Sequence, residues 1–392
     1  MTALDGITVL DLTRVLSGPY CTMLLADLGA RVVKVEQPGK GDDTRAWGPP
    51  FVHGESAYFL SVNRNKESIT LNLKHAEGLR LLHALIAKAD VLVENFRPGT
   101  LSRLGLDYES LRPQNPRLIY CSISGFGHTG PRRSEAGYDA VMQAEGGLMS
   151  ITGAADGPPF RLGVAIADIA SGMFAAQGIM AALISRERSG RGQQVDIGML
   201  DSVVALLSYQ AGIYFATGSP PTRMGNRHPT IVPYETFDAA DGEFVVAVGN
   251  DDQWRRFCDV VGIEPEGRFA TNRQRVTSYD ELRPILAERL GRQMRVHWID
   301  RLRAAGVPCG SVRDLEELFA DPQIAARQMA AEVDHPSIGR MRVLGTPFKL
   351  SETAASVRTP PPTLGQHTQS ILVNDLGRTG DQVAALRAAG VI

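Results

Sequence analysis

A long, weakly polar run near the middle of the chain constrains the fold more than any other feature of the 392 residues. Between residues 169 and 188, apolar side chains recur at steps of three and four, which is the spacing of one helix face. Many other positions in the run are glycine or alanine, so the predicted helix is slim and suited to close packing. Arg186 and Arg188 suit the negative end of the helix dipole, and Gly190 is placed to terminate the helix. We therefore predict one central, buried helix about 30 Å long.

Asp168 stands at the start of this helix, and two interpretations of it are open. As an N-cap, its carboxylate would accept hydrogen bonds from free backbone N–H groups of the first helical turn. As a nucleophile, it would be ionised at neutral pH with an ordinary pKa of about 3.9. Small neighbours in the lead-in, residues 163–167, would then let a bulky acyl group approach it. Position alone favours the cap, because most aspartates at this place in a helix do only that.

The composition is that of a globular protein long enough for two domains, with 43% hydrophobic and 21% charged residues. A formal net charge of −2 without a Lys/Arg block argues against a nucleic-acid partner or a membrane surface. No run approaches about 18 apolar residues, so we expect no membrane span. The N-terminal segment enters a strand without a signal peptide, which indicates a cytoplasmic protein. Four cysteines without a CxxC pair are expected to be free thiols in a reducing compartment: Cys21, Cys121, Cys258 and Cys309.

Strands and helices alternate along the first half of the chain. Residues 6–36 predict a strand, a helix and a second strand, which form a parallel pair with a right-handed crossover. Further strands are predicted at residues 68–73, 90–96 and 193–200. This alternation defines an α/β protein with a parallel sheet. The first turn reads TRVLSGP rather than GxGxxG, so a nicotinamide cofactor is poorly supported.

The polar segment 41–66 is rich in glycine and proline and carries three cations, Arg45, Arg64 and Lys66. It is either a solvated surface loop or an anion-recognition element, because Arg forks bind carboxylate and phosphate. A GxGxxG match at residues 125–130 opens no apolar helix, so we discount it and expect His128 to be a solvated loop side chain. The sequence contains no P-loop, no nucleophile elbow and no metal-ligand spacing.

Proline- and glycine-rich connections indicate the domain boundaries. We assign residues 1–217 to a large domain, 218–233 to a linker, 234–330 to a small α+β domain and 331–392 to a return to the large domain. The small domain is expected to begin with a hairpin that turns at Asp241-Gly242.

Several sequence blocks, in the right order, make the chain similar to the family III CoA transferases (CaiB/BaiF type), a group that includes formyl-CoA and carnitine CoA transferases. The blocks include LDLTRVLSGPYCTMLLADLGARVVKVEQPGKGDDTR, SVNRNKESITLNL, DVLVENFRPG, AGYDAVMQAEGG, SGRGQQVD and LGQHT, and the resemblance covers nearly the whole chain. It implies a Rossmann-like large domain and a smaller domain in a ring-shaped subunit, with two subunits interlocked as a homodimer. The implied substrates are an acyl-CoA and a carboxylic acid. The CoA thioester is then a co-substrate, and no cofactor is bound permanently.

In that family the aspartate before the central helix is the nucleophile, and the resemblance places this role on Asp168. The carboxylate would attack the thioester carbonyl, which gives a mixed anhydride and CoA thiolate. The thiolate would then attack the Asp168 carbonyl and leave aspartyl-CoA, and the acceptor acid would repeat the sequence in reverse. The site must exclude water, because an anhydride hydrolyses readily.

The resemblance also assigns CoA-binding positions, with three departures from the pattern of formyl-CoA transferase. Gln37 and Ala136 stand where that enzyme has Arg and Lys, so two phosphate partners are missing. Residues 225–229 stand in place of its flexible glycine loop. The implied CoA contacts are Leu16, Ser17, Leu71, Asn72, Leu73, Lys74, Asn95, Phe96, Arg97, Arg103 and Tyr138.

Three segments resemble the succinyl-CoA–glutarate transferase branch more than the formyl-CoA branch: residues 41–52, 58–66 and 231–237. The resemblance implies succinyl-CoA as donor and a short dicarboxylic acid as acceptor. A dicarboxylate keeps one carboxylate free after the reaction, and that charge needs a cation. Arg14 and Arg45 are the candidates, because a planar guanidinium fork suits a carboxylate. Either could instead hold a CoA phosphate or an internal carboxylate such as Asp43.

Three other functions are open at this stage. An α-methylacyl-CoA racemase has the same fold but uses a His where this chain has Tyr138, and Tyr exchanges protons poorly near neutral pH. A non-catalytic CoA-binding protein would not need Asp168. A nicotinamide dehydrogenase would need the dinucleotide fingerprint that the first turn lacks.

Overall fold

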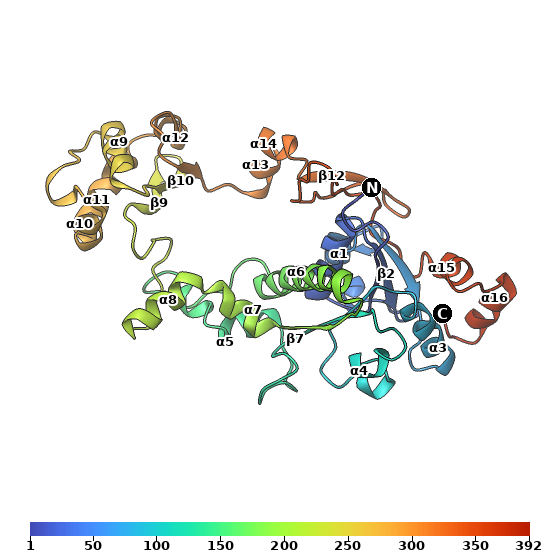
Figure 1. Ribbon diagram of the computed structural model, residues 1–392. Helices are drawn as coiled ribbons and strands as arrows, with labels where there is room; N and C mark the ends of the chain where they lie inside the picture. Colours follow the sequence, from blue (N-terminus) through green and yellow to red (C-terminus); the bar gives the residue numbers. More distant parts are fainter. The chain divides into compact units, whose positions relative to one another are not determined.

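The computed structural model describes residues 1–392, which form two compact units (Figure 1). The first unit comprises residues 1–148, 161–212 and 322–392, and the second comprises residues 149–160 and 213–321. The chain therefore leaves the first unit after residue 212 and returns at residue 322, whereas we expected residues 217 and 331. Each unit is described by itself below.

The first unit is built on a six-stranded parallel sheet, which confirms the expected α/β class. The strands follow the order β5-β2-β1-β6-β7-β8, and every neighbouring pair is parallel. Taken in chain order, this is the 3-2-1-4-5-6 arrangement of a doubly wound Rossmann sheet. The strands are β1 (Thr8–Asp11), β2 (Arg31–Glu36), β5 (Lys66–Thr70), β6 (Val91–Glu94), β7 (Ile119–Ser124) and β8 (Gln194–Gly198).

Helices cover both faces of this sheet (Figure 1). On one face, α1 (Ser17–Asp27) and α6 (Ile166–Ser189) pack against each other and share a core cluster with Val9 of β1. On the other face, α3 (Ala76–Ile86), α15 (Thr368–Asn374) and α16 (Gly380–Ala388) share a second cluster with Leu10. Successive strand residues serve opposite clusters, because side chains alternate across a strand. Both faces are therefore apolar, as buried parallel sheets require.

The predicted central helix is α6, and its start differs from the expectation. Ala165 is the N-cap and makes no side-chain capping bond, so Asp168 lies inside the first turn and does not cap the helix. Asp139 supplies the cap from a distance, because its Oδ1 accepts the backbone N–H of Ala167 at 2.9 Å. Gly190 ends the helix with φ 70°, as predicted.

Close packing between α1 and α6 depends on Gly172. A Cβ added there would lie 2.5 Å from the backbone oxygen of Ser17 and 3.2 Å from the nitrogen of Cys21. By length and composition alone α6 could cross a membrane, with a mean hydropathy of 1.5, but buried core helices pass the same test. The bent pair α7 (Met199–Leu206) and α8 (Ser208–Thr217) meets it together. The buried face of α6 packs on α1 and the sheet, as a core helix does.

The segment 41–66 fits neither of its expected roles throughout. Residues 46–54 are exposed, as in a solvated loop, but the segment also contains short elements and several fully buried polar side chains. Its cations are not free for anions either, because each one binds an internal carboxylate. Arg64 pairs with Asp27 at 2.6 Å, Lys66 with Asp11 at 3.0 Å and Arg45 with Glu36 at 2.7 Å.

The second unit contains a three-stranded antiparallel sheet packed with helices. Its strands β9 (Tyr234–Ala239) and β10 (Gly242–Ala247) form the expected hairpin, with Ala239 opposite Gly242. The remaining elements of the unit are η3 (Met149–Ile151), α9 (Asp251–Val261), η4 (Gly267–Phe269), α10 (Asn272–Thr277), α11 (Tyr279–Leu290), α12 (Arg295–Ala304), β11 (Cys309–Ser311) and α13 (Leu315–Phe319).

Short elements complete the first unit. They are η1 (Asp43–Ala46), β3 (Phe51–Val52), β4 (Glu55–Ser56), α2 (Ala57–Ser61), η2 (Ser102–Leu104), α4 (Tyr108–Leu111), α5 (Asp139–Glu145), α14 (Pro322–Ala326), β12 (Ala330–His335) and β13 (Gly339–Leu344).

Candidate active site

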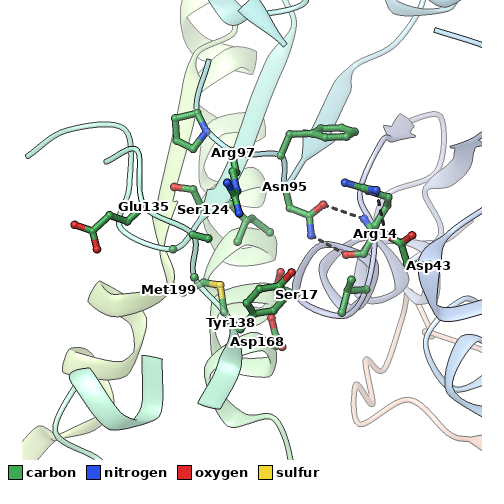
Figure 2. A pocket seen from close by; sticks show the side chains of 17 residues that line it. Arg14, Ser17, Asp43, Asn95, Arg97, Ser124, Glu135, Tyr138, Asp168 and Met199 are labelled. Atoms are coloured by element: carbon green, nitrogen blue, oxygen red, sulfur yellow. Dashed lines mark hydrogen bonds and ion pairs between the residues drawn. The ribbon is translucent and has the colours of Figure 1, made fainter. Parts of the chain in front are cut away.

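The strand order places a crevice between the ends of β1 and β6. These strands are neighbours, although the chain continues from β1 toward one edge of the sheet and from β6 toward the other. Ligands of open α/β sheets bind outside the carboxyl ends of strands at such a switch point. A pocket of about 200 Å³ lies here, and Figure 2 shows its lining side chains. The lining comes from several segments, which include Arg14, Val15 and Ser17 after β1, Asn95–Pro98, Glu135–Tyr138 and Asp168.

Asp168 lies half-buried in this pocket beside Ser17 and Tyr138 (Figure 2). Burial raises the pKa of Asp168 to about 7, and the negative charge of Asp139 contributes to the rise. A hydrogen bond from the Ser17 hydroxyl opposes the shift. The expectation of an ordinary carboxyl pKa is therefore wrong, because the site withholds water from the charged form. A carboxylate with a pKa near neutrality is typical of functional sites.

Asp139 fixes the first turn of α6, on which Asp168 lies. Its Oδ1 accepts from Ala167, and its Oδ2 accepts from the Gln143 side chain at 2.8 Å. The Gln143 carbonyl in turn accepts the backbone N–H of Leu162 at 2.9 Å. This chain of bonds ties the segment before α6 to α5. Sequence reasoning missed the role of Asp139, although it quoted the block that contains it.

Asn95 joins the loops that follow β1 and β6. Its side-chain amide donates to the Arg14 carbonyl at 2.7 Å, and its Oδ1 accepts the Arg14 N–H at 2.9 Å (Figure 2). The Arg14 guanidinium pairs with Asp43 at 3.0 Å and lies 5.1 Å from the centre of the Phe96 ring. These hydrogen bonds therefore hold the two loops together.

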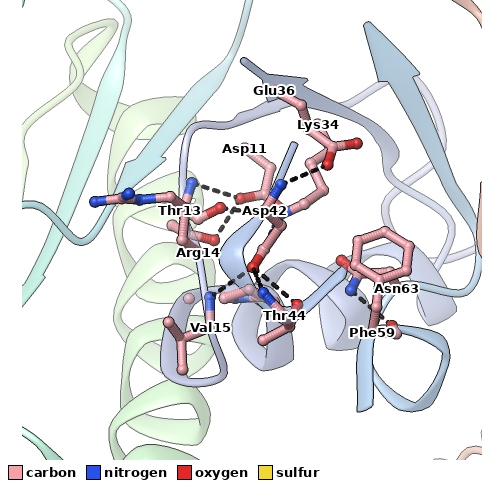
Figure 3. A network of polar contacts seen from close by, with 12 residues as sticks. Asp11, Thr13, Arg14, Val15, Lys34, Glu36, Asp42, Thr44, Phe59 and Asn63 are labelled. Carbon is pink, nitrogen blue, oxygen red and sulfur yellow. Dashed lines mark hydrogen bonds and ion pairs between the residues drawn. The ribbon is translucent and has the colours of Figure 1, made fainter. Parts of the chain in front are cut away.

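A buried polar network binds the loop that follows β1 (Figure 3). Lys34 pairs with Asp42 at 2.9 Å and donates to the Thr13 carbonyl at 2.8 Å. Asp42 also accepts the N–H of Val15 at 3.2 Å, which holds this β-branched residue at the unfavourable φ of 70°. Asp11 accepts the Thr13 N–H at 2.9 Å. Buried groups thus bind the loop at Thr13 and at Val15, which helps to keep Ser17 in place.

The charges of this network balance one another. Burial by itself would raise the pKa of Asp11, but Lys66 and Lys34 lower it well below its usual range. Burial lowers the pKa of Lys66 to about 8, although Asp11 opposes the shift. Removing any one partner would leave a buried charge unpaired, which costs several kcal/mol.

A second pocket of about 400 Å³ adjoins the first, and Arg14 and Phe96 line both. It lies outside the ends of β2 and β5. Two cations of its lining, Lys74 and Arg103, have no ion pair in the structure. Gln37 also lines it, and Ala136 lines the first pocket.

The structure brings most of the sequence-predicted CoA residues to these two pockets. Leu16 is an exception, because its side chain is buried with Met23 and Val62 beneath the first pocket. Residues 225–229 lie in the second unit. The first pocket contains Ser17, Asn95, Phe96, Arg97 and Tyr138, and the second contains Leu71, Asn72, Leu73, Lys74, Phe96 and Arg103.

Of the two candidate cations for a substrate carboxylate, only Arg14 lines the pockets. Arg45 makes two bonds of 2.7 Å to the oxygens of Glu36, and its guanidinium stacks 3.6 Å from the centre of the Phe59 ring. Its fork is thus occupied by Glu36, which lines the second pocket, and Arg45 itself lines neither pocket.

Tyr58 of α2 is a neighbour of the site that sequence reasoning missed. Burial raises the pKa of Tyr58 to about 12, and the negative charges of Asp168 and Asp139 contribute to the shift. The ring packs edge-on against Trp47 at 5.2 Å. No local pattern could identify it, because its closeness to Asp168 arises only in the fold. No group of three His, Cys, Asp or Glu side chains could hold a metal ion.

Comparison with known proteins identifies the family of this chain. The model of CoA-transferase family III matches residues 4–368. The chain is 44% identical over 393 residues to succinyl-CoA:glutarate CoA-transferase of Homo sapiens, covering 99% of this chain and 90% of that protein. It is 45% identical over 378 residues to succinate--glutarate CoA-transferase of Agrobacterium fabrum, covering 94% of each.

Solved structures agree with the sequence comparisons. A CAIB/BAIF family protein from Brucella suis superposes with a TM-score of 0.85 and 44% identity, covering 95% of this chain and 99% of that one. The chain therefore belongs to CoA-transferase family III. It is a CoA transferase, and a CoA thioester is its co-substrate.

Proposed function

We propose that this CoA transferase moves CoA from succinyl-CoA to a short dicarboxylic acid such as glutarate, with Asp168 as the nucleophile. The observation that carries the proposal is the position of Asp168 in a pocket that adjoins the groove of Leu71–Lys74 and Arg103. The names of the human and Agrobacterium relatives support the choice of substrates. The pKa of Asp168 near 7 leaves a large fraction of the carboxyl ionised and able to attack at neutral pH.

The reaction proceeds in two half-reactions. An oxygen of Asp168 bonds to the thioester carbonyl carbon, the C–S bond breaks, and sulfur leaves with the electron pair as CoA thiolate. The thiolate then attacks the side-chain carbonyl carbon of Asp168, and succinate leaves with the electron pair of the broken C–O bond. Asp168 now carries CoA as a thioester. Glutarate carboxylate reverses both steps and releases glutaryl-CoA.

Some cations of the site bind the CoA phosphates, and another binds the free carboxylate of the acyl group. Lys74 and Arg103 bind CoA phosphates, as the family pattern implies. Arg14 faces the free carboxylate of the dicarboxylate, because it lines the pocket of Asp168 and its side chain is 46% exposed. Arg97, which is exposed on the same pocket, substitutes for the cations missing at Gln37 and Ala136. A racemase is less well supported, because no His lines the Asp168 pocket to serve as its second acid–base group.

The subunit works as a homodimer of interlocked rings. Support comes from the solvent face of α6, where Met173, Gln177, Ala181 and Ile184 recur at helical spacing and are exposed. Met173 is 44% and Ile184 60% exposed, which is unusual for an apolar core helix. A second copy of the chain would cover this stripe. The four free cysteines fit a reducing cytoplasm.

The test is transfer from succinyl-CoA to a panel of acids: glutarate, malate, itaconate, oxalate, carnitine and monocarboxylates. Mass spectrometry reads the new acyl-CoA products, and glutarate or another short dicarboxylate should give the highest kcat/KM. A preference for a monocarboxylate or carnitine by more than about tenfold, or about 1.4 kcal/mol, would contradict the dicarboxylate proposal. Asp168→Asn should abolish transfer and lose the CoA adduct that the wild type forms. Substantial turnover by that variant would disprove the role of Asp168.

A further inference from the structure

Three polar side chains behind the CoA-binding loop form a chain of hydrogen bonds that the transfer reaction does not use. Glu94 ends β6 and is 3% exposed, and Ser122 on β7 is fully buried. The Ser122 hydroxyl bonds to Glu94 Oε1 on one side and lies 2.6 Å from His128 Nε2 on the other. His128 is half-buried and its ring bonds to Ser122, so it is not the solvated side chain expected from the sequence. Its backbone N–H donates to Asp196 at 3.0 Å.

The Ser122 hydroxyl has one proton and two partners, so the hydrogen-bonded side chains have two possible arrangements of their protons. When Glu94 is ionised, Ser122 donates to Glu94, and His128 must donate from Nε2 to Ser122. When Glu94 is protonated, Glu94 donates to Ser122, Ser122 donates to Nε2, and the imidazole carries its proton on Nδ1. The second arrangement contains one more proton than the first. The three side chains therefore gain or lose that proton as a unit.

This unit is bonded directly to the CoA-binding loop. Glu94 Oε2 accepts the backbone N–H of Phe96 at 2.8 Å. Phe96 lines both pockets, and its neighbour Asn95 binds the loop of Arg14. A hydrogen bond to an ionised carboxylate is shorter and stronger than one to a neutral carboxyl. The protonation of Glu94 thus changes how firmly the loop Asn95–Arg97 is held.

We propose that Glu94, Ser122 and His128 form a proton relay that positions the loop Asn95–Arg97 for CoA, so that binding of CoA takes up a proton. CoA brings negative phosphates to a loop that is bonded to Glu94, and this favours the protonated arrangement. His128 connects the relay to solvent, because it lines a cavity of about 170 Å³ with Glu94 and Arg97. The inference rests on the proposed CoA site.

The groups around the relay are consistent with titration near neutrality. Burial raises the pKa of Glu94 to about 7; bonds from Ser122 and Phe96 oppose this, and the charge of Asp196 on β8 adds to it. The Tyr120 hydroxyl on β7 also bonds to Glu94 and opposes the rise. The other charged groups that line the cavity are Arg97, Asp107 and Glu109.

Calorimetry tests the relay, with CoA itself as the ligand and Asp168→Asn as the parent protein. The parent has no Asp168 carboxyl, so it can neither react nor take up a proton at that position. The titration therefore measures binding alone. Titrations at pH 7 in buffers with different ionisation enthalpies give the number of protons taken up. Any titration of the phosphate groups of CoA is common to all variants, and only differences from the parent count.

Ser122→Ala in this parent should weaken CoA binding about fivefold at pH 7 and lose the proton uptake of the parent. His128→Gln offers an amide that does not titrate, and it should flatten the dependence of the CoA dissociation constant on pH between 6 and 8. Ser202→Ala is the control, because that buried hydroxyl bonds only to the Gly198 carbonyl at the start of its own helix. It should bind CoA as the parent does.

Unchanged affinity and proton uptake in both Ser122→Ala and His128→Gln would overturn the relay. If thermal unfolding shows that Ser122→Ala does not fold, His128→Gln alone decides, because its side chain is half-buried. Failure of the relay is separate from failure of the proposed function. If the wild type does not transfer CoA from succinyl-CoA, the proposed function is wrong. Altered CoA binding in the variants would still support the relay in that case.

Discussion

At the residue scale, the proposed role of Asp168 as a nucleophile would need a carboxyl that is buried enough to keep water from an anhydride and ionised enough to attack. Burial and the neighbouring Asp139 raise its pKa to about 7, while the bond from Ser17 limits the rise. The ionised carboxylate therefore lowers the stability of the folded protein, and its charge would serve only the proposed reaction. Such a site trades stability for activity.

Asp168→Asn should make the protein more stable, and by an amount that depends on pH. The unfolded chain releases this proton near pH 3.8, but the folded protein does so near pH 7. The contribution of Asp168 to stability is thus lost as pH rises between these values and stays low above pH 7. We expect Asp168→Asn to raise the free energy of unfolding by about 2 kcal/mol at pH 8 and much less near pH 4. Thermal melts of both proteins at several pH values measure this, and a pH-independent difference would contradict it.

Substitutions of Asp139 separate its charge from its role as a distant cap. Asp139→Asn removes a negative charge beside Asp168, so the acidic limb of the kcat/KM profile should move about one unit lower in pH. Asp139→Ala also removes the acceptor of the Ala167 N–H and should lower the free energy of unfolding by about 1 kcal/mol. The pH profiles of kcat/KM and thermal unfolding of both variants measure these two effects. Identical pH limbs in the wild type and Asp139→Asn would show that the charge does not reach Asp168.

At the scale of elements, the contact between α1 and α6 sets the site, because Ser17 opens one helix and Asp168 lies in the first turn of the other. The helices approach so closely that only a glycine fits at position 172. The buried network of Lys34, Asp42 and Asp11 holds the loop that leads into α1. The position of Ser17 relative to Asp168 thus depends on helix packing and on buried ion pairs together.

Gly172→Ala should therefore damage both stability and activity. Its Cβ would meet the Ser17 backbone oxygen at 2.5 Å, and backbone cannot move aside as a side-chain tip can. We expect a loss of about 1–3 kcal/mol in the free energy of unfolding, as for other overpacked contacts, and a lower kcat as Ser17 shifts from Asp168. Gly163→Ala is the matched control for stability, because its Cβ would meet no atom within 4 Å. Equal melting temperatures for the two variants would rule out the tight contact.

At the scale of the whole molecule, the exposed stripe of α6 and the divided large unit support the interlocked dimer. Exposed apolar residues continue onto α7, where Val204 is 49% and Leu206 39% exposed. Interlocked subunits would bury far more than the roughly 1,600 Å² of a standard interface. The dimer should then persist at nanomolar concentration.

Light scattering should give twice the subunit mass for the wild type at micromolar concentration. Ile184→Arg places a charge on the α6 stripe and should produce monomer or poorly folded protein. Leu315→Arg, at an apolar site that is 71% exposed in the second unit, is the matched control and should stay dimeric. A stable wild-type monomer would refute the dimer.

The sequence by itself determined the elements whose signals are local. The βαβ start at 6–36, the hairpin at Asp241-Gly242 and the end of α6 at Gly190 follow from periodicity and from turn chemistry, which involve neighbours along the chain. The family also followed from the sequence, because many blocks in order are far more specific than any one motif. The assignment of Asp168 as the nucleophile came from that resemblance and stays a prediction.

Only the tertiary structure decided which partner each charge finds. Arg64 binds Asp27, 37 residues away, and Lys66 binds Asp11, 55 residues away, so no local pattern could show that these cations are occupied. The same holds for Arg45 and for the raised pKa of Asp168, which depends on burial and on Asp139. Charge–charge energies and desolvation depend on distance in space and on exclusion of water. The chain sets neither until the sheet and its helices have packed.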